Sequence, residues 1–395
     1  MSENLAAAAR EIDENLRTWR RHLHAHPELS GCEEQTARYI AGALRAMGYE
    51  PQERINGTHG LMATLRVNDD APVVALRADI DALPITEENT VEYASRNPGV
   101  MHACGHDAHA AMLMGAAKLL MAGKARLKRS VRLVFQPHEE SFPGGAPDMI
   151  AGGALAGASS IFGIHISSML PTGQVGTRVG PFMAAVNGLK IRIIGKGGHA
   201  AMPDLAIDPV VTAANVIVAL QTIVSRTVTP SEPAVVTVTQ IHAGTADNVI
   251  PTEVELGGTI RTFSSQVRTT VCRRVKEIAE SVAAAHGAKA VVDTRDGYPV
   301  LVNDRQTTDA ALAAARDIGF NDDRIVALAP IGGGEDFAYY AEKIPASFVF
   351  LGAASEAREC VYPHHHPRFN VDEDALAHGA ALYAQYAFNA GAAGR

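Results

Sequence analysis

Hydrophobic positions recur at helical spacing over residues 3–48, which predicts a helical section at the start of the chain. Two short apolar stretches follow, 60–67 and 72–77, and the second is apolar at nearly every position, as in a strand covered on both faces. A helical pattern over 107–123 and a strand pattern over 130–136 continue the rhythm of strand, helix and strand. This order indicates a buried, mainly parallel sheet.

The pattern changes after an apolar strand at 160–166, in a stretch rich in proline and glycine, and we place a domain boundary near residue 186. The segments that follow have the order βαββαβ, which is typical of a ferredoxin-like α+β sandwich: 188–195, 208–228, 234–241, 253–262, 266–286 and 289–293.

After residue 298 the chain resumes the first pattern, with a helix over 307–318, a buried strand over 347–351 and a helix over 373–390. The sequence therefore predicts an α/β fold of two domains. Its mainly parallel catalytic domain comprises residues 1–186 and 299–395, and a ferredoxin-like α+β domain, residues 187–298, is inserted into it.

Composition excludes several classes of protein. Of 395 residues, 47% are hydrophobic, which excludes a disordered chain. With 35 basic and 43 acidic residues the net charge is −8, so we expect no nucleic-acid partner. No apolar run reaches the roughly 18 residues of a membrane span, and no signal peptide is evident, so we expect a cytoplasmic protein without a membrane partner. The four cysteines are too scattered for a disulfide scaffold.

The segment MHACGHDAH, residues 101–109, carries the strongest chemical signal. Cys104 and His106 offer a thiolate and an imidazole two residues apart, and these donors suit Zn²⁺ and other late divalent ions. Two alternatives remain for this segment by itself. Cys104 is either a buried cysteine beside capping residues or, because it precedes a helix and has histidines nearby, a catalytic nucleophile.

A second segment, QPHEES, places Glu139 and Glu140 just after a predicted strand. Side chains of adjacent residues in an extended chain point in opposite directions, so one carboxylate is free to bind metal while the other faces a substrate. Metal-assisted hydrolysis needs one ligand and one base. A solvated turn is the alternative for this pair alone, and HEESF lacks the second histidine of the zincin helix motif.

Two further segments supply imidazoles, GIH ending at His165 and the run His364–His366. By itself His165 would be a core histidine, and the triple histidine a surface loop. Taken together with Cys104, His106 and Glu140, they supply the five ligands that two adjacent divalent ions share. Asp79 and Asp81, just after the strand 72–77, either orient a metal-binding histidine or cap turns.

As a set, these segments resemble the metal-dependent amidohydrolases of the aminoacylase and carboxypeptidase superfamily. The branch indicated contains hippurate hydrolase, the hydrolases of auxin–amino-acid conjugates and bacterial N-acyl-amino-acid amidohydrolases. The resemblance covers about residues 15–390, and the motifs that carry it are RRHLHAHPELS, LRADIDALP, HACGHDAH, VRLVFQPHEE, GIH, GKGGHAAMP, NVIP, GTIRTF and GGEDFA.

The resemblance implies a catalytic domain holding two divalent ions, of zinc, manganese, cobalt or nickel, and an inserted lid domain that often forms a homodimer, with a tetramer also open. The metal ligands implied are Cys104, His106, Glu140, His165 and His365, with Cys104 as a candidate bridge between the ions. His365 aligns best with the last ligand, although His364 and His366 flank it.

The resemblance also assigns roles in catalysis. Glu139 resembles the general base that takes a proton from the attacking water, and His199 resembles the residue that supports the oxyanion, donated in some relatives across the dimer. Without the family we would interpret His199 as a turn cap and Arg261 as an exposed strand charge. The remaining assignments are Asn248 and Arg261 on the substrate carboxylate and Asp79, Asp81 and Asp107 behind the ligands.

The chain departs from the usual family pattern at His138, at SFP after the glutamate pair, at ISSMLP after His165 and at HHHP. These positions surround the expected acyl pocket, so the departures concern the identity of the substrate rather than the chemistry. The predicted activity is metal-dependent hydrolysis of an N-acyl amino acid or a related small amide with a free carboxylate. The alternatives are a cysteine-nucleophile amide hydrolase and an inactive carboxylate-binding protein on the same fold.

Overall fold

The computed structural model describes residues 5–67 and 71–390, and the chain divides into two units. The first unit contains the chain up to Gly180, together with Val302–Ala329 and the chain from Asp336 onward. The second unit contains Pro181–Leu301 and Pro330–Glu335.

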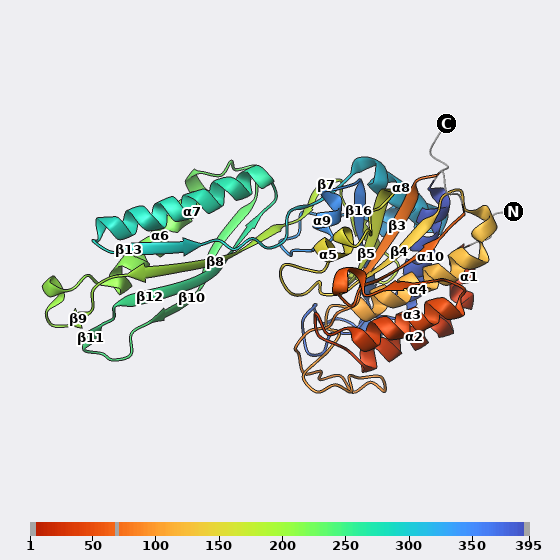
Figure 1. Ribbon diagram of the computed structural model, residues 1–395, viewed down its shortest axis with the longest axis horizontal. Coiled ribbons are helices and arrows are strands. Elements are labelled where there is room, and N and C mark those ends of the chain that lie inside the picture. Colours follow the sequence, from red (N-terminus) through yellow and green to blue (C-terminus); the bar gives the residue numbers. More distant parts are fainter. Residues whose placement is uncertain (1–4, 68–70, 391–395) are drawn as a thin grey trace. The chain divides into compact units, whose positions relative to one another are not determined.

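The first unit is built on an eight-stranded sheet (Figure 1). In spatial order its strands are β1 (Gln52–Glu53), β2 (Leu61–Leu65), β4 (Val131–Gln136), β3 (Val73–Asp79), β5 (Ala158–Pro171), β16 (Ala346–Ala354), β6 (Val175–Thr177) and β15 (Ile325–Ala327). The central neighbours β4, β3, β5 and β16 run parallel, whereas β1 and β2 at one edge are antiparallel additions. The predicted mainly parallel sheet is confirmed.

Eight α-helices belong to the described part of this unit. They are α1 (Leu5–Glu11), α2 (Asp13–Ala25), α3 (Glu34–Ala46), α4 (His106–Ala122), α5 (Ala146–Ala151), α8 (Arg305–Asp317), α9 (Ala338–Ala341) and α10 (Asp374–Asn389). The predicted N-terminal helical section is thus three helices, and the segment with Pro27 separates the second from the third. Proline restricts the residue before it to extended backbone, which ends the helical pattern there.

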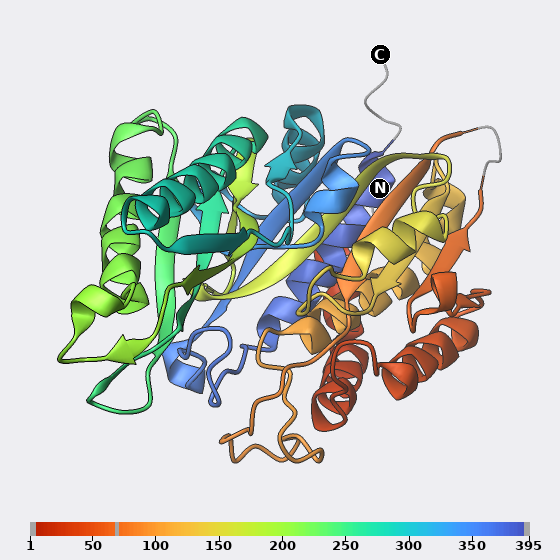
Figure 2. The same cartoon turned by 60° about the vertical axis from the view of Figure 1, so that its left-hand side comes forward.

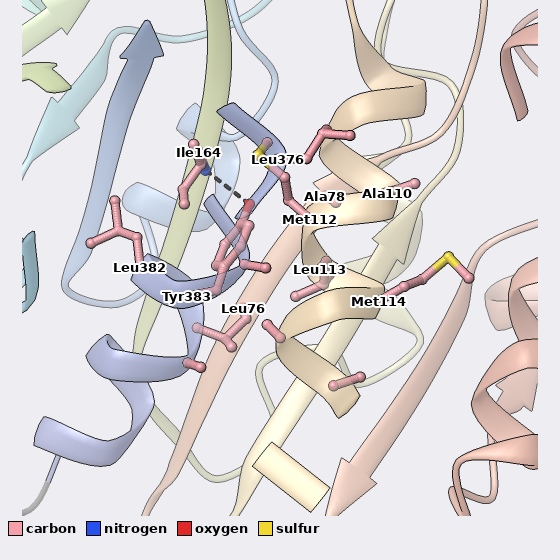
Figure 3. Close-up of a cluster of buried hydrophobic side chains, with 14 of the residues drawn as sticks. Leu76, Ala78, Ala110, Met112, Leu113, Met114, Ile164, Leu376, Leu382 and Tyr383 are labelled. Atoms are coloured by element: carbon pink, nitrogen blue, oxygen red, sulfur yellow. Dashed lines mark hydrogen bonds between the residues drawn. The ribbon is translucent and has the colours of Figure 1, made fainter. Parts of the chain in front are cut away.

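Helices α4 and α10 cover one face of the sheet (Figure 3). Leu76 of β3 and Met112 of α4 are fully buried in the core between them. Tyr383 of α10 fixes the helix to two strands, because its hydroxyl donates to the carbonyl of Arg77 at 2.7 Å and accepts from the amide of Ile164 at 3.0 Å. α4 is buried along nearly its whole length, so its first residues are held firmly against the sheet.

The second unit has a four-stranded antiparallel sheet with two helices on one face (Figure 2). Its elements follow the predicted order βαββαβ, and Asp208 caps α6 by accepting from the amide of Val210 at 2.8 Å. In chain order they are β8 (Ala185–Ile194), α6 (Pro209–Arg226), β10 (Ala234–Ala243), β12 (Glu253–Thr262), α7 (Ser265–Ala285) and β13 (Lys289–Asp293).

The sheet of the second unit has the order β10-β12-β8-β13, which leaves β10 and β13 at its edges. Two short two-stranded sheets complete the described structure. They pair β9 (Gly198–His199) with β11 (Val249–Ile250), and β7 (Gly180–Met183) with β14 (Leu301–Asn303).

By length and composition alone, α6 is apolar enough to cross a membrane. Its position in the second unit accounts for this composition differently. Val216, Leu220 and Ile223 are fully buried against the sheet, while Val211 and Val218 lie exposed on the other side. The helix is therefore apolar on the buried face and in part on the exposed face as well.

Candidate metal centre

Five candidate ligands from four parts of the first unit meet at the carboxyl ends of its parallel strands. Glu140 follows β4, His165 lies in β5, His106 opens α4 with Cys104 just before it, and His365 lies in the loop between β16 and α10. Ligands in open α/β sheets gather at this edge because the strand ends and the following loops converge there. The structure thus brings together residues that are up to 261 positions apart.

These residues form two groups of three donors that share one thiol. The Sγ atom of Cys104 belongs to a group with His106 and His165 and to another with Glu140 and His365, and the donor atoms in each group lie within 4.8 Å of one another. The Sγ atom is 3.5 Å from Nε2 of His165, and Nε2 of His365 is 3.4 Å from Oε1 of Glu140. The thiol, imidazole and carboxylate donors of both groups suit divalent ions such as Zn²⁺.

Hydrogen bonds orient the imidazole rings of two candidate ligands. Nδ1 of His106 donates to Oδ1 of Asp81 at 3.2 Å, and Nδ1 of His165 donates to the carbonyl of Ile166 at 2.6 Å. In each ring the other nitrogen, Nε2, is then the one that would bind a cation in place of a proton. Among the described residues, Nε2 of His106 and Oε1 of Glu140 are buried without a hydrogen-bond partner. Buried polar atoms need a partner, and a bound cation would supply it to both.

The electrostatics of the cluster favour positive charge. Burial lowers the pKa of His106, but the negative charge of Asp79 and of Asp81, which also accepts its hydrogen bond, outweighs burial and raises that pKa to about 10. Burial and the charges of Glu140 and Glu139 raise the pKa of the Cys104 thiol well above its ordinary value. A site that holds a proton this firmly on His106 is a site of strongly negative potential, which attracts divalent cations.

Glu139 and Glu140 both reach the cluster. Their carboxylates and a ring nitrogen of His106 lie within 4.8 Å of one another, and Glu139 is buried. The prediction that the two side chains point in opposite directions is wrong, because both carboxylates reach the same ring of His106. His138, directly before the pair, has φ of +61°, so the chain turns there instead of continuing β4.

The three consecutive histidines have three different environments. His365 contacts Glu140 and is half-exposed, while the ring of His364 is buried 5.1 Å from that of His165. Burial lowers the pKa of His364 to about 4, so this ring is neutral. His366 stacks on Tyr362. Of the three, His365 is the one that joins a group of candidate ligands.

Two of the three aspartates predicted behind the ligands contact the cluster, and the third does not. Asp81 contacts His106 directly, and Oδ2 of Asp79 is 3.8 Å from Nε2 of the same ring. The carboxylate of Asp107 instead accepts from Arg20 and from His24, each at 2.8 Å. Side chains at consecutive helical positions face different sides, so Asp107 points toward α2 when His106 points toward the cluster.

The sequence did not single out His109, yet it supports the site. Its Nδ1 donates to Asp79 at 2.5 Å and its Nε2 accepts from the amide of Ile166 at 2.8 Å. His109 therefore fixes the strand directly after His165. The spacing in HDAH, three residues from His106, places both rings on one face of α4 and was the available signal.

Asp336, in the loop GGEDFA, was also not assigned a role. It is fully buried, accepts from Arg77 at 2.7 Å and from the side-chain amide of Gln136 at 2.7 and 2.9 Å, and accepts from the backbone amide of Ala146 at 3.0 Å. It thereby holds both ends of the loop that carries the glutamate pair.

The remaining predicted residues, His199, Asn248 and Arg261, belong to the second unit. The backbone carbonyl of Asn248 accepts from the amide of Ala200, next to His199, where β9 and β11 pair. Arg261 lies near the last residue of β12, eight residues beyond its start at Glu253, which corresponds to about 26 Å of strand. Asn248 and Arg261 of one chain therefore do not meet on one carboxylate.

Arg261 itself has the environment of a binding residue. It is half-buried, burial lowers its pKa, and its Nη1 atom is buried with no hydrogen-bond partner in the described part of the chain. An unsatisfied guanidinium nitrogen suits a carboxylate ligand.

Comparisons with known proteins identify the class. The model of the peptidase family M20/M25/M40 matches residues 75–389, so the chain belongs to this family, and it is a hydrolase. It is 47% identical over 301 residues to an N-acyl-L-amino acid amidohydrolase of Geobacillus stearothermophilus, covering 76% of this chain and 81% of that protein. It is 40% identical to thermostable carboxypeptidase 2 of Saccharolobus solfataricus, with 97% of each covered.

A solved structure agrees in fold. A Bacillus subtilis protein described as a dinuclear metal-binding peptidase of the M20 family superposes with a TM-score of 0.85 at 38% identity, covering 96% of this chain and 99% of that one. The resemblance found in the sequence and the mixed α/β fold are confirmed.

Proposed function

We propose that this protein hydrolyses the amide bond of small N-acyl amino acids that carry a free carboxylate. The observation that supports this most is the arrangement of a glutamate pair beside two three-donor groups that share Cys104. This arrangement provides two sites for divalent ions and one carboxylate beyond the ligand set, which is what hydrolysis by an activated water needs.

The roles follow from the positions of the side chains. Cys104, His106, Glu140, His165 and His365 would hold two divalent ions, which when bound would supply Lewis acidity toward the amide carbonyl and the attacking water. Glu139 takes the proton from that water and passes it to the nitrogen of the leaving amine. The donor set of thiolate, imidazole and carboxylate suits zinc, with manganese, cobalt and nickel as the other candidates.

A nucleophilic Cys104 is less consistent with this site. Burial and the neighbouring carboxylates raise the pKa of its thiol, so without a cation the sulfur stays protonated and unreactive. A role as metal ligand uses the same surroundings, because the cation replaces the proton.

For the second unit we propose substrate binding and assembly. Arg261 holds the substrate carboxylate, and His199 and Asn248, at the other end of that unit, serve the site of a second copy of the chain. A homodimer formed through the second unit supplies that copy. We further propose that the enzyme acts in the cytoplasm.

The test is a hydrolysis assay with N-acetyl, N-benzoyl and indole-acetyl amino acids after chelation and reloading with each of the four metals. We expect no turnover in chelator and recovery with at least one metal. Glu139→Gln should lower kcat by about 10²- to 10⁴-fold with unchanged metal content, because the base is lost while the ligands remain. Exposed Glu342→Gln is the matched control.

A dipeptide belongs in the same panel, because the similarity to a carboxypeptidase makes a peptide the second candidate substrate. A C-terminal residue of a peptide is itself an N-acyl amino acid, so the same groups would serve.

Turnover of the Glu139→Gln variant at the wild-type rate would contradict the proposed role of this residue.

A further inference from the structure

Glu33 is a buried carboxylate that contacts the loop carrying the glutamate pair from a distant part of the chain. It directly precedes α3 and is 0% exposed. Its Oε1 atom accepts from the amide of Gly31 at 2.8 Å and from the amide of His138 at 2.9 Å. The second contact joins two segments 105 residues apart, one residue before Glu139.

The backbone that Glu33 holds is unfavourable by itself. His138 has φ of +61°, a region that residues with a side chain rarely adopt unless their surroundings enforce it. Directly after this turn, Glu139 and Glu140 both bring a carboxylate oxygen to the cluster. A hydrogen bond to the amide of His138 is therefore a restraint on the direction of the glutamate pair.

Asp81 provides the matching restraint on the other side of Glu139. Its Oδ2 atom accepts from the amide of Glu140 at 2.9 Å and from the hydroxyl of Ser30 at 2.6 Å. The amides on both sides of Glu139 thus donate to carboxylates, and both carboxylates are tied to residues 30–33. The ring of His138 also lies against this segment, since a Cβ atom on Gly31 would be 3.5 Å from its Nδ1.

The burial of the Glu33 carboxylate also destabilises the folded protein. Its Oε2 atom is buried with no hydrogen-bond partner among the described residues, and an unpaired buried oxygen is destabilising. Burial, with the charge of Asp81 adding to it, raises the pKa of Glu33 to about 7 despite the amides that it accepts from. A core position that served folding alone would be filled better by an apolar side chain.

We infer that Glu33 is a positioning residue for catalysis, whose Oε1 atom fixes the left-handed turn at His138 and thereby directs Glu139 toward the reacting water. This inference rests on the proposed function, because it assumes that Glu139 is the base. Within residues 5–67 and 71–390, Glu33 has no hydrogen bond to a candidate ligand side chain, so it acts through the backbone amide of His138.

The experiment compares three substitutions in the full-length enzyme, assayed at saturating metal so that altered metal affinity does not contribute. Glu33→Ala removes the acceptor and should lower kcat by about 10- to 100-fold, because small displacements of a catalytic group have effects of this size, while KM stays within about twofold. Glu33→Gln keeps an oxygen acceptor without the charge and should restore most of kcat. Glu33→Asp keeps the charge but is too short to reach His138, and should fall below Glu33→Gln.

A higher kcat for Glu33→Gln than for Glu33→Asp would show that Glu33 acts by positioning the backbone, and not through its charge or through overall stability. The opposite order, or equal kcat in all three variants, would overturn the inference. If Glu33→Ala does not fold, the kcat of Glu33→Gln compared with that of Glu33→Asp still tests the inference. Glu34→Ala, at the exposed neighbouring position, is the matched control and should have wild-type kcat.

Including Glu139→Gln in the same series separates this inference from the proposed function. An inactive Glu139→Gln together with a fully active Glu33→Ala would reject only the role of Glu33. An active Glu139→Gln would reject the base itself, and the inference about Glu33 with it.

Discussion

Asp81 shows how one carboxylate organises several parts of the site. It accepts from Nδ1 of His106, from the amide of Glu140 and from the hydroxyl of Ser30, and it is 1% exposed. By fixing which nitrogen of His106 carries the hydrogen, Asp81 leaves Nε2 ready to bind a cation. Its charge also adds to the negative potential of the cluster.

Asp81→Asn should therefore weaken metal binding by about 10- to 100-fold, the range typical of residues behind metal ligands. Titration of the metal-free protein with zinc, followed by calorimetry, measures this directly. Activity should return at high metal concentration, because the ligands themselves are intact. Asp323→Asn, at an exposed position, serves as the control. Wild-type metal affinity in Asp81→Asn would show that the contact between Asp81 and His106 does not affect metal binding.

At the scale of elements, the C-terminal helix α10 belongs to the buried core of the first unit. Most of its residues are buried, and it packs against both α4 and α8. His378, in the middle of this helix, lies beside the ring of Phe320 at 5.4 Å between centroids. Burial, together with the charges of Arg10 and Arg324, lowers its pKa below the ordinary 6.5.

A lowered pKa in the folded state has a definite consequence for stability. As pH falls below about 6.5, the unfolded chain binds a proton at His378 that the folded chain does not, so the folded state loses stability. When the pH is lowered from 7.5 to 5, we expect the Tm of His378→Gln to fall less than the Tm of the wild type. Exposed His286→Gln should keep the wild-type dependence. Identical Tm profiles for wild type and His378→Gln would refute this expectation.

At the scale of the whole molecule, the second unit exposes apolar side chains on helix α6 and on the edge strand β10. Val211 and Val218 on α6 are 51% and 71% exposed, and they lie seven residues apart, on one side of the helix. β10 is an edge strand with exposed Val235 and Ile241, and unpaired edges readily add a strand. Both features are consistent with the proposed homodimer.

Val218→Glu should weaken that dimer, because it places a charge in the apolar surface of α6. Light scattering after size exclusion should give the mass of a dimer for the wild type and a larger monomer fraction for the variant. Thr222→Glu, one turn further along the same face, tests the extent of the surface. Val302→Glu, at an exposed valine of the first unit, is the control. A monomeric wild type would contradict the proposal.

The sequence alone determined the features that depend on neighbours in the chain. Alternating and helical spacings gave the parallel strands and the βαββαβ insertion, because burial of one face imposes its period on a short segment. The segment HACGHDAH indicated a candidate metal site, because its donors are close in sequence. The end of β5 was missed, since Ser167 and Ser168 end the apolar pattern while pairing with β16 continues to Pro171.

Only the tertiary structure decided which distant groups meet. It brought His365, of three consecutive histidines, to Cys104 and Glu140, turned Asp107 toward Arg20, and brought Glu33 to the amide of His138. Each of these outcomes depends on sheet order and on the direction of a side chain at a turn. Those quantities are set by packing between segments far apart in the chain, and local sequence patterns carry no record of them.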